Sequence, residues 1–469
     1  MNVCIVNPPV EKVIEKVYDT PDFPRAALAF LAGYLRENSD LAKVRVIDCK
    51  FDRLDFDQCV KKIEDLEIKI LALTAMTNEI KSAAKVAKLI KEINPKTITI
   101  VGGQHLSALP EETLREFPQF DYGIVGEAET SFLEFVEAVA KSDLTHFYNI
   151  KGLCFLEEDQ FVNGGASVML ADQEGLNPAW DMFRSAQSYY IQSSRGCPFE
   201  CNFCINPGGR VVRPRSVEKT LDEIGELIEN HGPKTINFGD EIFTVKRQRT
   251  LDICQGLIKR GYHKKINWWC QTHVNTLDDE MVKLMKASNC LMVGLGIETG
   301  DEITMKNMGK GITLDKVKNA IFILDKYSLK YNTYFILGQP YETVKSAKNT
   351  INFAVEINPH LPIFGLMVPY PGTKVWDMAI SGEGNYKLKS KDWDAFNKQI
   401  GDALELTGIS RNRLERIQFF GYLKVFLYNL RLIDLVGFVW KYKTEGFTLI
   451  KKFINNFIID IKYKLITVT

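Results

Sequence analysis

The chain lacks an excess of either charge: 59 lysines and arginines balance 59 aspartates and glutamates among its 469 residues. A chain whose main partner is nucleic acid usually carries a basic excess, so no nucleic-acid partner is expected. No uninterrupted apolar run reaches the roughly 18 residues that a membrane span requires. The N-terminus has neither a basic region nor a long enough apolar run for a secretory signal. We therefore expect a cytoplasmic protein.

A secretory disulfide framework is also missing, because the ten cysteines are spread through a long chain. Free cysteines in such numbers fit a reducing cytoplasm. The 45% hydrophobic and 25% charged content is that of an ordinary globular protein with an ample core. The length suggests roughly three domains.

Three cysteines stand close together, Cys197, Cys201 and Cys204, in the spacing C-x3-C-x2-C. A cubane iron–sulfur cluster that only transfers electrons has one thiolate on each of its four irons. Three clustered thiolates leave one iron open, and an open iron can bind a substrate or a cofactor. This spacing is the most informative feature of the chain.

Zinc is an alternative ligand for the three thiolates. A structural zinc site is closed by four ligands, usually as two separated pairs. The remaining cysteines of this half of the chain, Cys254, Cys270 and Cys290, are scattered in or beside apolar runs and offer no obvious partner pair. The spacing therefore favours the cluster over zinc.

The segment from Ser194 to Cys204, with Phe203 directly before the last cysteine, resembles the radical S-adenosylmethionine (radical SAM) superfamily. The resemblance implies a [4Fe–4S] cluster held by the three cysteines, with S-adenosylmethionine chelating the open iron. It also implies reductive cleavage of S-adenosylmethionine to a 5′-deoxyadenosyl radical that abstracts hydrogen from a substrate. A low-potential electron donor of the flavodoxin or ferredoxin type is the implied partner.

The first 150 residues alternate short apolar runs with helical patterns, which predicts a parallel sheet with helices on both faces. The expected strands are Val3–Val6, Val44–Ile47, Ile68–Leu73, Ile98–Val101 and Tyr122–Val125. The expected helices are Ala26–Arg36, Ile80–Ile93 and Thr130–Ala140. In such sheets a ligand lies at the carboxyl ends of the strands, near a topological switch.

The stretch Gly102–Glu111, followed by Asp121–Glu127, resembles the cobalamin-binding-type domain that is fused to one branch of radical SAM enzymes. The resemblance implies bound cobalamin, and the residues expected to contact it are Asn7, Thr74, Gly102, Gly103, Gly126 and Glu127. The Asp-x-His-x-x-Gly loop that supplies a cobalt ligand in many cobalamin proteins is absent. We therefore expect no ligand from His105, and a relic domain that only shapes the substrate pocket is the alternative.

Residues 183–385 alternate strands and helices again, and six strand–helix repeats fit the partial (β/α)6 barrel of the radical SAM family. By the resemblance, Asp240 and Glu241 accept a hydrogen bond from the amino group of S-adenosylmethionine. Capping of the next turn is the alternative for both. Gly296 and Glu298 resemble the motif that lines the ribose and adenine region. His273 ends the third strand, and we assign it no role.

The chain is expected to divide into a cobalamin-binding-type domain (1–150), a linker with a β-hairpin (151–182), the barrel (183–385) and a C-terminal helical domain (386–469). From residue 411 onward, eleven basic residues face four acidic ones among many aromatics. Such a segment either packs as a cap over the barrel or lies on an anionic membrane. The cap is the favoured reading, and membrane association is the alternative.

The expected fold class is therefore α/β: a doubly wound Rossmann-like domain, a partial barrel and a helical cap. The expected function is that of a cobalamin-dependent radical SAM enzyme, which methylates carbon in a small-molecule, lipid or peptide substrate. Ring formation or rearrangement is the other outcome within the family. A methylthiotransferase acting on RNA or a ribosomal protein is an alternative, although Cys4, Cys49 and Cys59 lack its second cysteine motif. A cobalamin-binding or iron–sulfur electron-transfer protein is the alternative outside enzymes.

Overall fold

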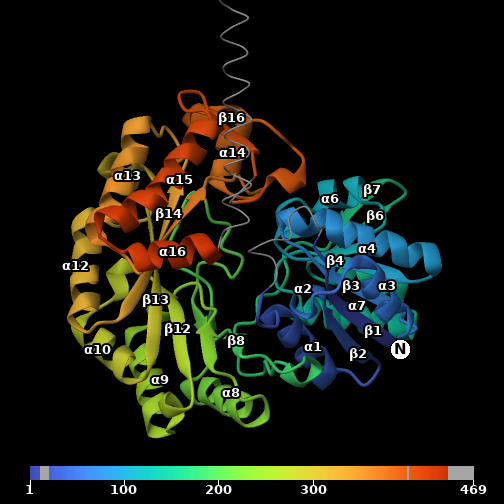
Figure 1. The fold of residues 1–469 in the computed structure, drawn as a ribbon. Helices are drawn as coiled ribbons and strands as arrows, with labels where there is room; N and C mark the ends of the chain where they lie inside the picture. The colour runs from blue at the N-terminus through green and yellow to red at the C-terminus, as the bar shows by residue number, and fades with distance from the viewer. Residues whose placement is uncertain (11–20, 399–400, 442–469) are drawn as a thin grey trace, which may run out of the picture.

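We describe the protein from a computed structural model, in residues 1–10, 21–398 and 401–441. Two α/β lobes lie side by side, the first in blue and cyan and the second in green to orange (Figure 1). The last described helices, in red, run along the second lobe. The expected C-terminal helical domain beyond residue 441 lies outside the described residues.

The N-terminal lobe is built on a seven-stranded sheet in the order β2-β1-β3-β4-β5-β6-β7. Its first five strands pair in parallel and its last two antiparallel. The strands are β1 (Asn2–Asn7), β2 (Lys43–Asp48), β3 (Ile70–Thr74), β4 (Ile98–Gly102), β5 (Tyr122–Ile124), β6 (Leu153–Glu157) and β7 (Gln160–Asn163). The chain changes direction across the sheet between β1 and β3, which is the switch point where ligands of this fold lie.

Helices cover both faces of this sheet, as the apolar runs of its strands require. On one face α1 (Ala26–Asn38) packs against α7 (Glu129–Lys141), and on the other α3 (Phe56–Glu64) packs against α4 (Ile80–Ile93). Shorter helices join them: α2 (Cys49–Asp52), η1 (Thr77–Glu79), α5 (Gln104–Ala108), α6 (Pro110–Glu116) and η2 (Leu144–Asn149). The expected doubly wound arrangement is therefore present.

The second lobe is an open sheet of six parallel strands in the order β15-β14-β13-β12-β11-β8. The strands are β8 (Ser188–Ile191), β11 (Thr235–Phe238), β12 (Asn267–Thr272), β13 (Cys290–Glu298), β14 (Lys330–Leu337) and β15 (Leu361–Leu366). β8 and β15 lie at opposite edges, so the barrel is partial, as expected. Carboxyl ends of all six strands meet at one edge, where barrel chemistry is found.

Polar N-caps set where the barrel helices begin. The side chains of Ser216, Asp278, Thr313 and Thr343 each accept a hydrogen bond from a backbone N–H in the first helical turn. Each such cap contributes about 1 kcal/mol. The helices are α8 (Val217–Asn230), α9 (Arg247–Lys259), α10 (Asp279–Ala287), α11 (Glu302–Asn307), α12 (Leu314–Lys326), α13 (Val344–Ile357) and α14 (Lys374–Ser381), with short turns η4 (Phe243–Val245), η5 (Tyr262–Lys264) and η6 (Val274–Thr276).

The linker after residue 151 joins the first lobe's sheet before it reaches the barrel. Its hairpin, expected from the sequence, is the antiparallel pair β6–β7 at the sheet edge. The chain then passes over α1, where a Cβ on Gly33 would lie 1.8 Å from the carbonyl oxygen of Asn177. The turn η3 (Trp180–Met182) follows and leads into β8.

The segment after residue 386 is not helical from its start, which differs from the expectation. It opens with a short antiparallel pair, β16 (Tyr386–Leu388) and β17 (Leu404–Leu406), together with the turns η7 (Glu383–Asn385) and η8 (Trp393–Ala395). Trp393 and Phe396 pack on the apolar core of the N-terminal lobe, so tertiary contacts replace a helical pattern here. Only then do α15 (Arg411–Tyr428) and α16 (Leu432–Lys441) follow.

Candidate functional site

The three cysteines lie on one loop at the carboxyl edge of the barrel, directly after β8. The short strands β9 (Ser194–Arg195) and β10 (Arg213–Pro214) pair antiparallel and close the base of this loop. Within it, the Cys197 N–H donates to the Gly209 carbonyl at 3.0 Å, and the Asn206 amide donates to the Cys197 carbonyl at 2.7 Å. The loop is therefore held in shape by its own backbone.

Gly196 is required by this geometry. Its φ is +97°, in the region that favours glycine. A Cβ at this position would lie 2.2 Å from the Val211 carbonyl oxygen, on the returning side of the loop. The glycine therefore permits the close approach that brings the two ends of the cysteine loop together.

The thiols differ in exposure: Cys197 and Cys201 are half-buried, and Cys204 is exposed. Burial raises the pKa of Cys201 to about 11, and the nearby Lys310 ammonium acts against this rise. Burial also raises the pKa of Cys197. Among the described residues, no three His, Cys, Asp or Glu side chains are arranged to hold one metal ion. Thiolates that bind separate irons of a cubane fit this arrangement better than thiolates that share a zinc ion.

Asp240 and Glu241, at the end of β11, have different surroundings. The buried Asp240 carboxylate accepts hydrogen bonds from the Ser193 N–H and from the hydroxyls of Ser193 and Ser194, each at 2.7 Å. Glu241 keeps one buried carboxylate oxygen, Oε2, without a hydrogen-bond partner. Burial raises the pKa of Glu241, and the charge of the neighbouring Asp240 raises it further. Of the two acids, only Glu241 has a buried oxygen without any partner, and it is the better candidate to accept from the amino group of S-adenosylmethionine.

Gly296 and Glu298, at the end of β13, are both held by Lys310. The Lys310 ammonium donates to the Gly296 carbonyl at 2.7 Å and forms a buried ion pair with the Glu298 carboxylate. Glu298 has a φ of +69°, where the register between β13 and β14 shifts. Both Lys310 and Glu298 act electrostatically on Cys201, so this pair borders the cysteine loop. Lys310 carried no motif and was missed by the sequence analysis.

Two aromatic residues of the cysteine loop face the barrel. Phe203 is half-buried and packs against the barrel core. Phe199 stacks on His273, with ring centroids 3.9 Å apart and planes at 9°. Burial lowers the pKa of His273 to about 4, so its ring is neutral near pH 7. The position of His273 at a strand end was the only signal in the sequence of this supporting role.

At the carboxyl edge of the N-terminal sheet, Thr74 and Gly102 pair across β3 and β4 and are half-buried. A Cβ on Gly102 would meet no atom closer than 3.8 Å, which leaves room above the sheet. Gly103 has a φ of +106°, and a Cβ there would lie 2.5 Å from the Ala75 carbonyl. These residues form a glycine-lined ledge at the carboxyl ends of β3 and β4, beside the switch point, which fits the approach of a flat macrocycle such as cobalamin.

Asn7, another expected cobalamin contact, is fully buried. Its amide donates to Asp48 at 2.7 Å, and its side-chain oxygen accepts from Arg25 at 2.8 Å. Arg25 and Lys50 both pair with Glu79. Burial alone would raise the pKa of Glu79, but the charge of Arg25, followed by that of Lys50, lowers it to about 2. Asn7 therefore belongs to a polar network beneath the ledge, and its contact with cobalamin stays a prediction.

Glu127, the last expected cobalamin contact, joins the two lobes. Its carboxylate pairs with Arg213 at the base of the cysteine loop, lies 3.5 Å from Arg195, and accepts from the Leu170 N–H of the linker. Arg195 pairs in addition with Glu129 at 2.6 Å. The four charged side chains are nearly buried and balance each other. The neighbouring Gly126, by contrast, is exposed and only its N–H is bonded, to Ser107.

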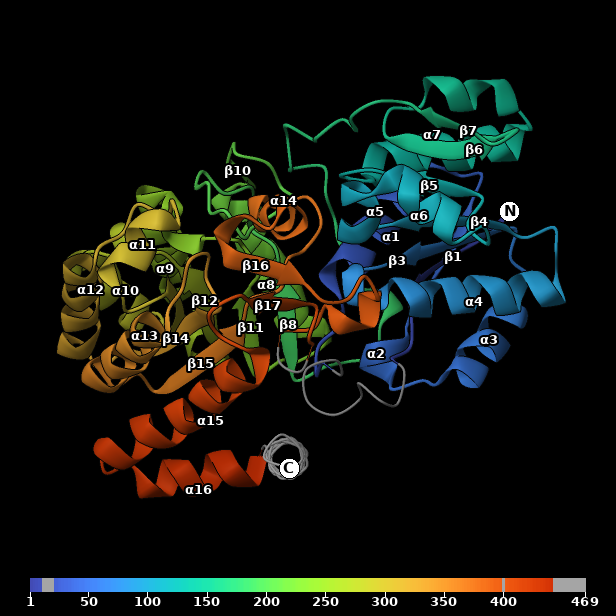
Figure 2. The ribbon, with the colours of Figure 1, turned by 90° about the horizontal axis from the view of Figure 1, so that it is seen from above.

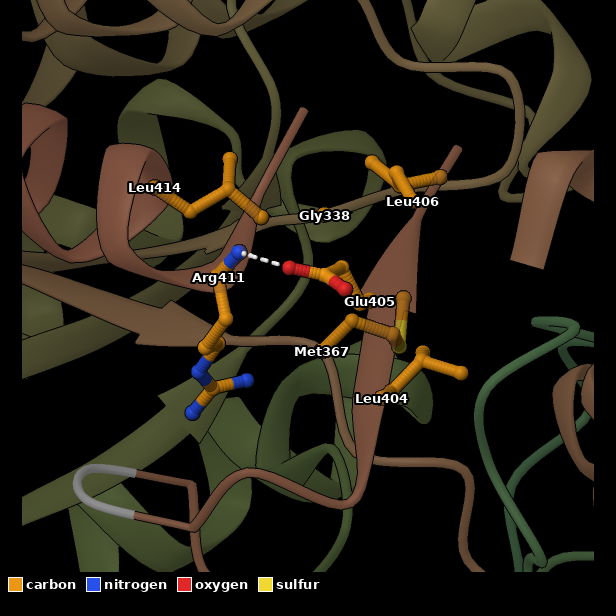
Figure 3. Close-up of a pocket in the computed structure, with 7 residues that line it drawn as sticks. All are labelled: Gly338, Met367, Leu404, Glu405, Leu406, Arg411 and Leu414. Carbon is orange, nitrogen blue, oxygen red and sulfur yellow. Dashed lines mark hydrogen bonds between the residues drawn. The ribbon is translucent and has the colours of Figure 1, made fainter. Parts of the chain in front are cut away.

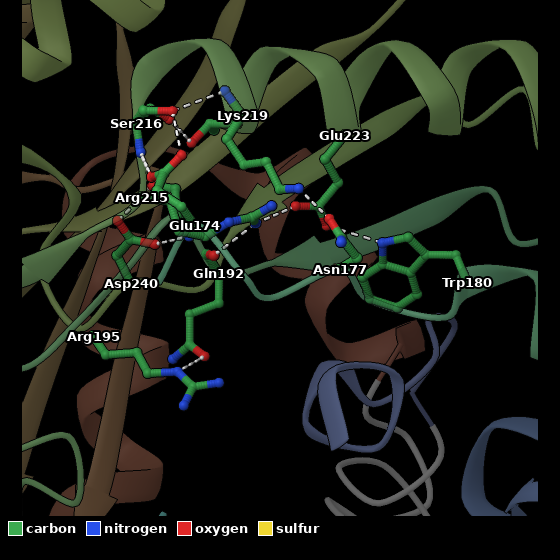
Figure 4. Close-up of polar contacts among 12 residues, drawn as sticks. Glu174, Asn177, Trp180, Gln192, Arg195, Arg215, Ser216, Lys219, Glu223 and Asp240 are labelled. Carbon is green, nitrogen blue, oxygen red and sulfur yellow. Dashed lines mark hydrogen bonds and ion pairs between the residues drawn. The ribbon is translucent and has the colours of Figure 1, made fainter. Parts of the chain in front are cut away.

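Polar contacts also fix the strand that precedes the cysteine loop (Figure 4). Arg195 bonds Gln192 at 3.1 Å, and the buried Arg215 bonds the Gln192 carbonyl at 3.3 Å. Arg215 also forms an ion pair with Glu223 of α8, and Trp180 of the linker donates to the same carboxylate. The linker, α8 and the start of the loop are thereby tied together.

His105 lies in the short helix α5, two residues after Gly103. Its ring is buried and meets Trp393 edge-on, with centroids 4.6 Å apart. Neither ring nitrogen has a hydrogen-bond partner among the described residues. Burial lowers the pKa of His105 to about 4, so the ring is neutral near pH 7.

A small cavity of about 10 Å³ lies near the ends of β14 and β15 (Figure 3). Its lining is mainly apolar: Gly338, Met367, Leu404, Glu405, Leu406, Arg411 and Leu414. Ligand pockets usually measure about 300–1,000 Å³. We therefore do not assign this cavity as a substrate or cofactor site.

Comparisons with known proteins agree with the two sites. Residues 191–354 match the model of the radical SAM superfamily, and residues 16–136 match that of the B12 binding domain. An uncharacterized methyltransferase of Pyrococcus horikoshii is 30% identical over 460 residues, which cover 95% of this chain and 98% of the relative. An anaerobic magnesium-protoporphyrin IX monomethyl ester cyclase of Cereibacter sphaeroides is 27% identical over 367 residues, covering 76% of this chain and 60% of the relative.

Solved structures share the fold. The radical S-adenosylmethionine methyltransferase TsrM from Kitasatospora setae, solved with cobalamin and a [4Fe–4S] cluster, has a TM-score of 0.69 at 16% identity, covering 85% of this chain and 78% of that one. The cobalamin-dependent radical enzyme OxsB, solved with aqua-cobalamin, has a TM-score of 0.66 at 23% identity, covering 77% and 53%. The cysteine loop, the glycine-lined ledge and these matches agree on the cofactors: a [4Fe–4S] cluster, S-adenosylmethionine and cobalamin. The chain belongs to the family of cobalamin-dependent radical SAM enzymes.

Proposed function

We propose that this enzyme transfers a methyl group to a carbon atom of a small-molecule, lipid or peptide substrate. The observation that carries the proposal is the direct joint between the cysteine loop and the cobalamin-binding lobe, made by Glu127, Arg195 and Arg213. An enzyme that only cleaves S-adenosylmethionine has no need to place a second cofactor domain against its cluster loop. The name of the Pyrococcus horikoshii relative, a methyltransferase, supports the same reading.

The protein's own residues bind and orient. Cys197, Cys201 and Cys204 would hold three irons of the cluster, and Cys204 is the most exposed of them. When bound, the cofactors supply radical chemistry at an unactivated carbon and a methyl group for transfer. The protein contributes position and a surrounding from which water is excluded.

Glu241 is the residue we assign to the amino group of S-adenosylmethionine. Its orphan carboxylate oxygen is buried, and a buried acceptor without a partner is costly unless a ligand supplies the donor. The ammonium group of the cofactor is such a donor, and the resulting charge-assisted hydrogen bond is of the strong kind. Glu298, neutralised by Lys310, would line the same site without adding net charge.

Substrate and reductant are further partners in the proposal. A low-potential flavodoxin or ferredoxin is the electron donor we expect, since the cluster needs one electron for each cleavage. Ring closure is a second candidate reaction, favoured by the cyclase relative of Cereibacter sphaeroides. A methylthiotransferase is less supported, because Cys4, Cys49 and Cys59 of the N-terminal lobe lack the cysteine motif of a second cluster.

A half-reaction separates methyl transfer from ring closure without knowledge of the substrate. The enzyme is reconstituted anaerobically with iron, sulfide and hydroxocobalamin, reduced, and incubated with S-adenosylmethionine that carries a trideuterated methyl group. Mass spectrometry is expected to find trideuterated methylcobalamin in the wild-type enzyme. A variant that lacks the three thiols of the cluster loop forms the same product only if methyl transfer to cobalt needs no cluster. Formation of 5′-deoxyadenosine with no labelled methylcobalamin would overturn the methyltransferase proposal and favour ring closure.

A further inference from the structure

Helix α16, Leu432–Lys441, is apolar on nearly every side. Its sequence is Leu-Ile-Asp-Leu-Val-Gly-Phe-Val-Trp-Lys, and Asp434 is the only acid in it. Only Leu435 and Phe438 are half-buried, whereas Ile433 is 89% exposed and Val436 69%. A helix that is apolar all round is normally buried. The outer side of α16 therefore needs a cover.

The exposed apolar area continues into the preceding turn. Leu427 and Tyr428 end α15, and Leu430 in the turn is 84% exposed. We define the C-terminal apolar surface by the large exposed side chains of this region: Leu427, Tyr428, Leu430, Leu432, Ile433, Val436 and Val439. A grouping of this kind on a soluble face marks an interaction site or a membrane contact.

The helical pair that carries this surface is firmly fixed to the barrel. Phe438 of α16 stacks on Tyr422 of α15, with ring centroids 4.8 Å apart. Arg431, in the turn, bonds the carbonyls of Pro359 and His360 and pairs with Asp434. The two helices project from the barrel lobe beyond α13 and β15, at the bottom of the view (Figure 2). The apolar surface is thus presented outward on a rigid support.

The charge of the chain around this surface selects its partner. After the buried Arg411–Glu415 pair, from Arg416 to the end, the sequence holds nine lysines and arginines against three acids, an excess of six. Residues 442–469, which continue directly from α16, contribute five basic residues and two acids. Basic residues beside an apolar helix are attracted to anionic lipid, whereas two copies of one basic surface repel each other.

We propose that the C-terminal apolar surface docks on the face of an anionic lipid bilayer, with α16 lying in the interface. No described helix is long and apolar enough to cross a membrane. In this proposal α16 lies along the surface of the bilayer and does not span it. The exposed side chains enter the boundary between headgroups and acyl chains, and the cations of the segment bind the lipid phosphates. The docking is independent of the reaction, so the two proposals fail separately.

Co-sedimentation of the full-length protein with vesicles tests the docking. Vesicles of phosphatidylcholine alone are compared with vesicles in which about a third of the lipid is phosphatidylglycerol. The test variant is Ile433→Ser/Val436→Ser, which removes apolar area without changing charge. The matched control is Ile303→Ser, an equally apolar side chain that is 75% exposed on α11 of the barrel.

The wild-type chain and the control are expected to pellet with the anionic vesicles, less so as salt screens the charges. The double variant is expected to bind about tenfold more weakly or worse, because less apolar area is buried. A wild-type chain that stays in solution with both vesicles, or a double variant that binds like the wild type, overturns the proposal. A concentration-dependent dimer that the double variant abolishes would assign the surface to a second copy. Slow amide exchange of α16 without vesicles, at every protein concentration, would assign it to residues 442–469.

Discussion

The Ser194 hydroxyl donates a hydrogen bond of 2.7 Å to the Asp240 carboxylate, three residues before the first cysteine of the cluster loop. Together with the two bonds from Ser193, it engages both oxygens of the Asp240 carboxylate and fastens the end of β11 to the start of the loop. The neighbouring Glu241 keeps a free buried oxygen. Two adjacent acids of one motif thus have separate tasks, one in holding the loop and one in binding.

Replacement of each acid by its amide separates these tasks. Asp240→Asn leaves buried donors poorly matched and is expected to lower the unfolding free energy by about 1–3 kcal/mol. Glu241→Gln keeps the shape but removes the charge, and is expected to weaken S-adenosylmethionine binding about tenfold with little change in stability. Thermal unfolding and equilibrium dialysis of the reconstituted protein measure the two effects. The assignment is wrong if Asp240→Asn loses affinity at unchanged stability while Glu241→Gln binds normally.

Replacement of Cys197, Cys201 and Cys204 by alanine is expected to abolish the cluster's visible absorbance, its bound iron and the cleavage of S-adenosylmethionine. Cys4, Cys49 and Cys59 provide a matched control triple, since all three are buried in the N-terminal lobe. Their replacement by alanine is expected to lower the melting temperature through lost packing but to leave the iron content unchanged. Iron that survives the first triple change, or is lost with the second, contradicts the assignment of the cluster.

Local patterns in the sequence were sufficient for most of the fold. The β14 strand follows from an apolar run, and α8 begins where Ser216 caps it, so both needed only neighbouring residues. The cysteine loop was equally local, because its ligands lie within eight residues. The helical pattern from residue 411 was local as well, whereas the short strand pair β16–β17 before it was not expected, since contacts of this segment with the N-terminal lobe set its shape.

The parts of the site that the sequence did not indicate are pairs of residues far apart in the chain. Arg213 meets Glu127 across 86 residues, and no motif links them. Lys310 likewise stands in an unremarkable glycine-flanked turn, yet it neutralises Glu298. Asn7 was expected to be a ligand contact because it follows a strand, but its hydrogen bonds are used within the protein. Complementary charges specify such pairings only after the backbone has brought them together.

His105→Ala is expected to leave the spectrum of bound cob(II)alamin unchanged. The ring is buried and meets Trp393 edge-on, so we expect no imidazole nitrogen on cobalt in the wild-type protein either. Electron paramagnetic resonance shows such a nitrogen as a splitting of the cobalt lines. A splitting that is present in the wild type and absent in the variant would refute the expectation.

Protonation of the same histidine makes stability depend on pH. The pKa of His105 is about 4 in the folded protein, below the usual 6.5. Between these two pH values the unfolded chain therefore binds the proton more readily than the folded protein. This contribution to stability is therefore complete above about pH 6.5 and is lost as the pH falls toward 4. His105→Ala is expected to flatten the acid side of the melting-temperature profile. An unchanged acid slope in the variant would assign the pH dependence to other groups.

Glu342 predicts the opposite pH dependence. Burial raises its pKa to about 8, above the usual 4.5, so the carboxyl is protonated near pH 7. This contribution is complete below about pH 4.5 and is lost as the pH rises through 8, because the folded state must then bury a charge. Glu342→Gln, which cannot ionise, is expected to melt similarly to the wild type at about pH 4.5 and higher than the wild type at about pH 9. If the difference in melting temperature between wild type and variant is constant across this pH range, Glu342 is already ionised in the folded protein.

The joint made by Glu127 predicts that one uncharged substitution loosens the cysteine loop. In Glu127→Gln, Arg195 keeps Glu129, but Arg213 loses its buried counter-charge beside the loop. Removal of one partner from a buried pair leaves an uncompensated charge, which is strongly destabilising locally. Amide exchange in residues 196–212 is therefore expected to quicken about tenfold or more, with smaller changes elsewhere.

Asp181→Asn is the matched control, because it breaks the exposed Arg36–Asp181 pair between α1 and the linker and leaves the loop untouched. In the reconstituted protein, the magnetic interaction between reduced cluster and cob(II)alamin is expected to become heterogeneous in Glu127→Gln but not in the control. Unchanged exchange and an unchanged interaction in Glu127→Gln would mean that the backbone of the loop alone sets its position, and that Glu127 is free for the contact with cobalamin that the sequence predicts.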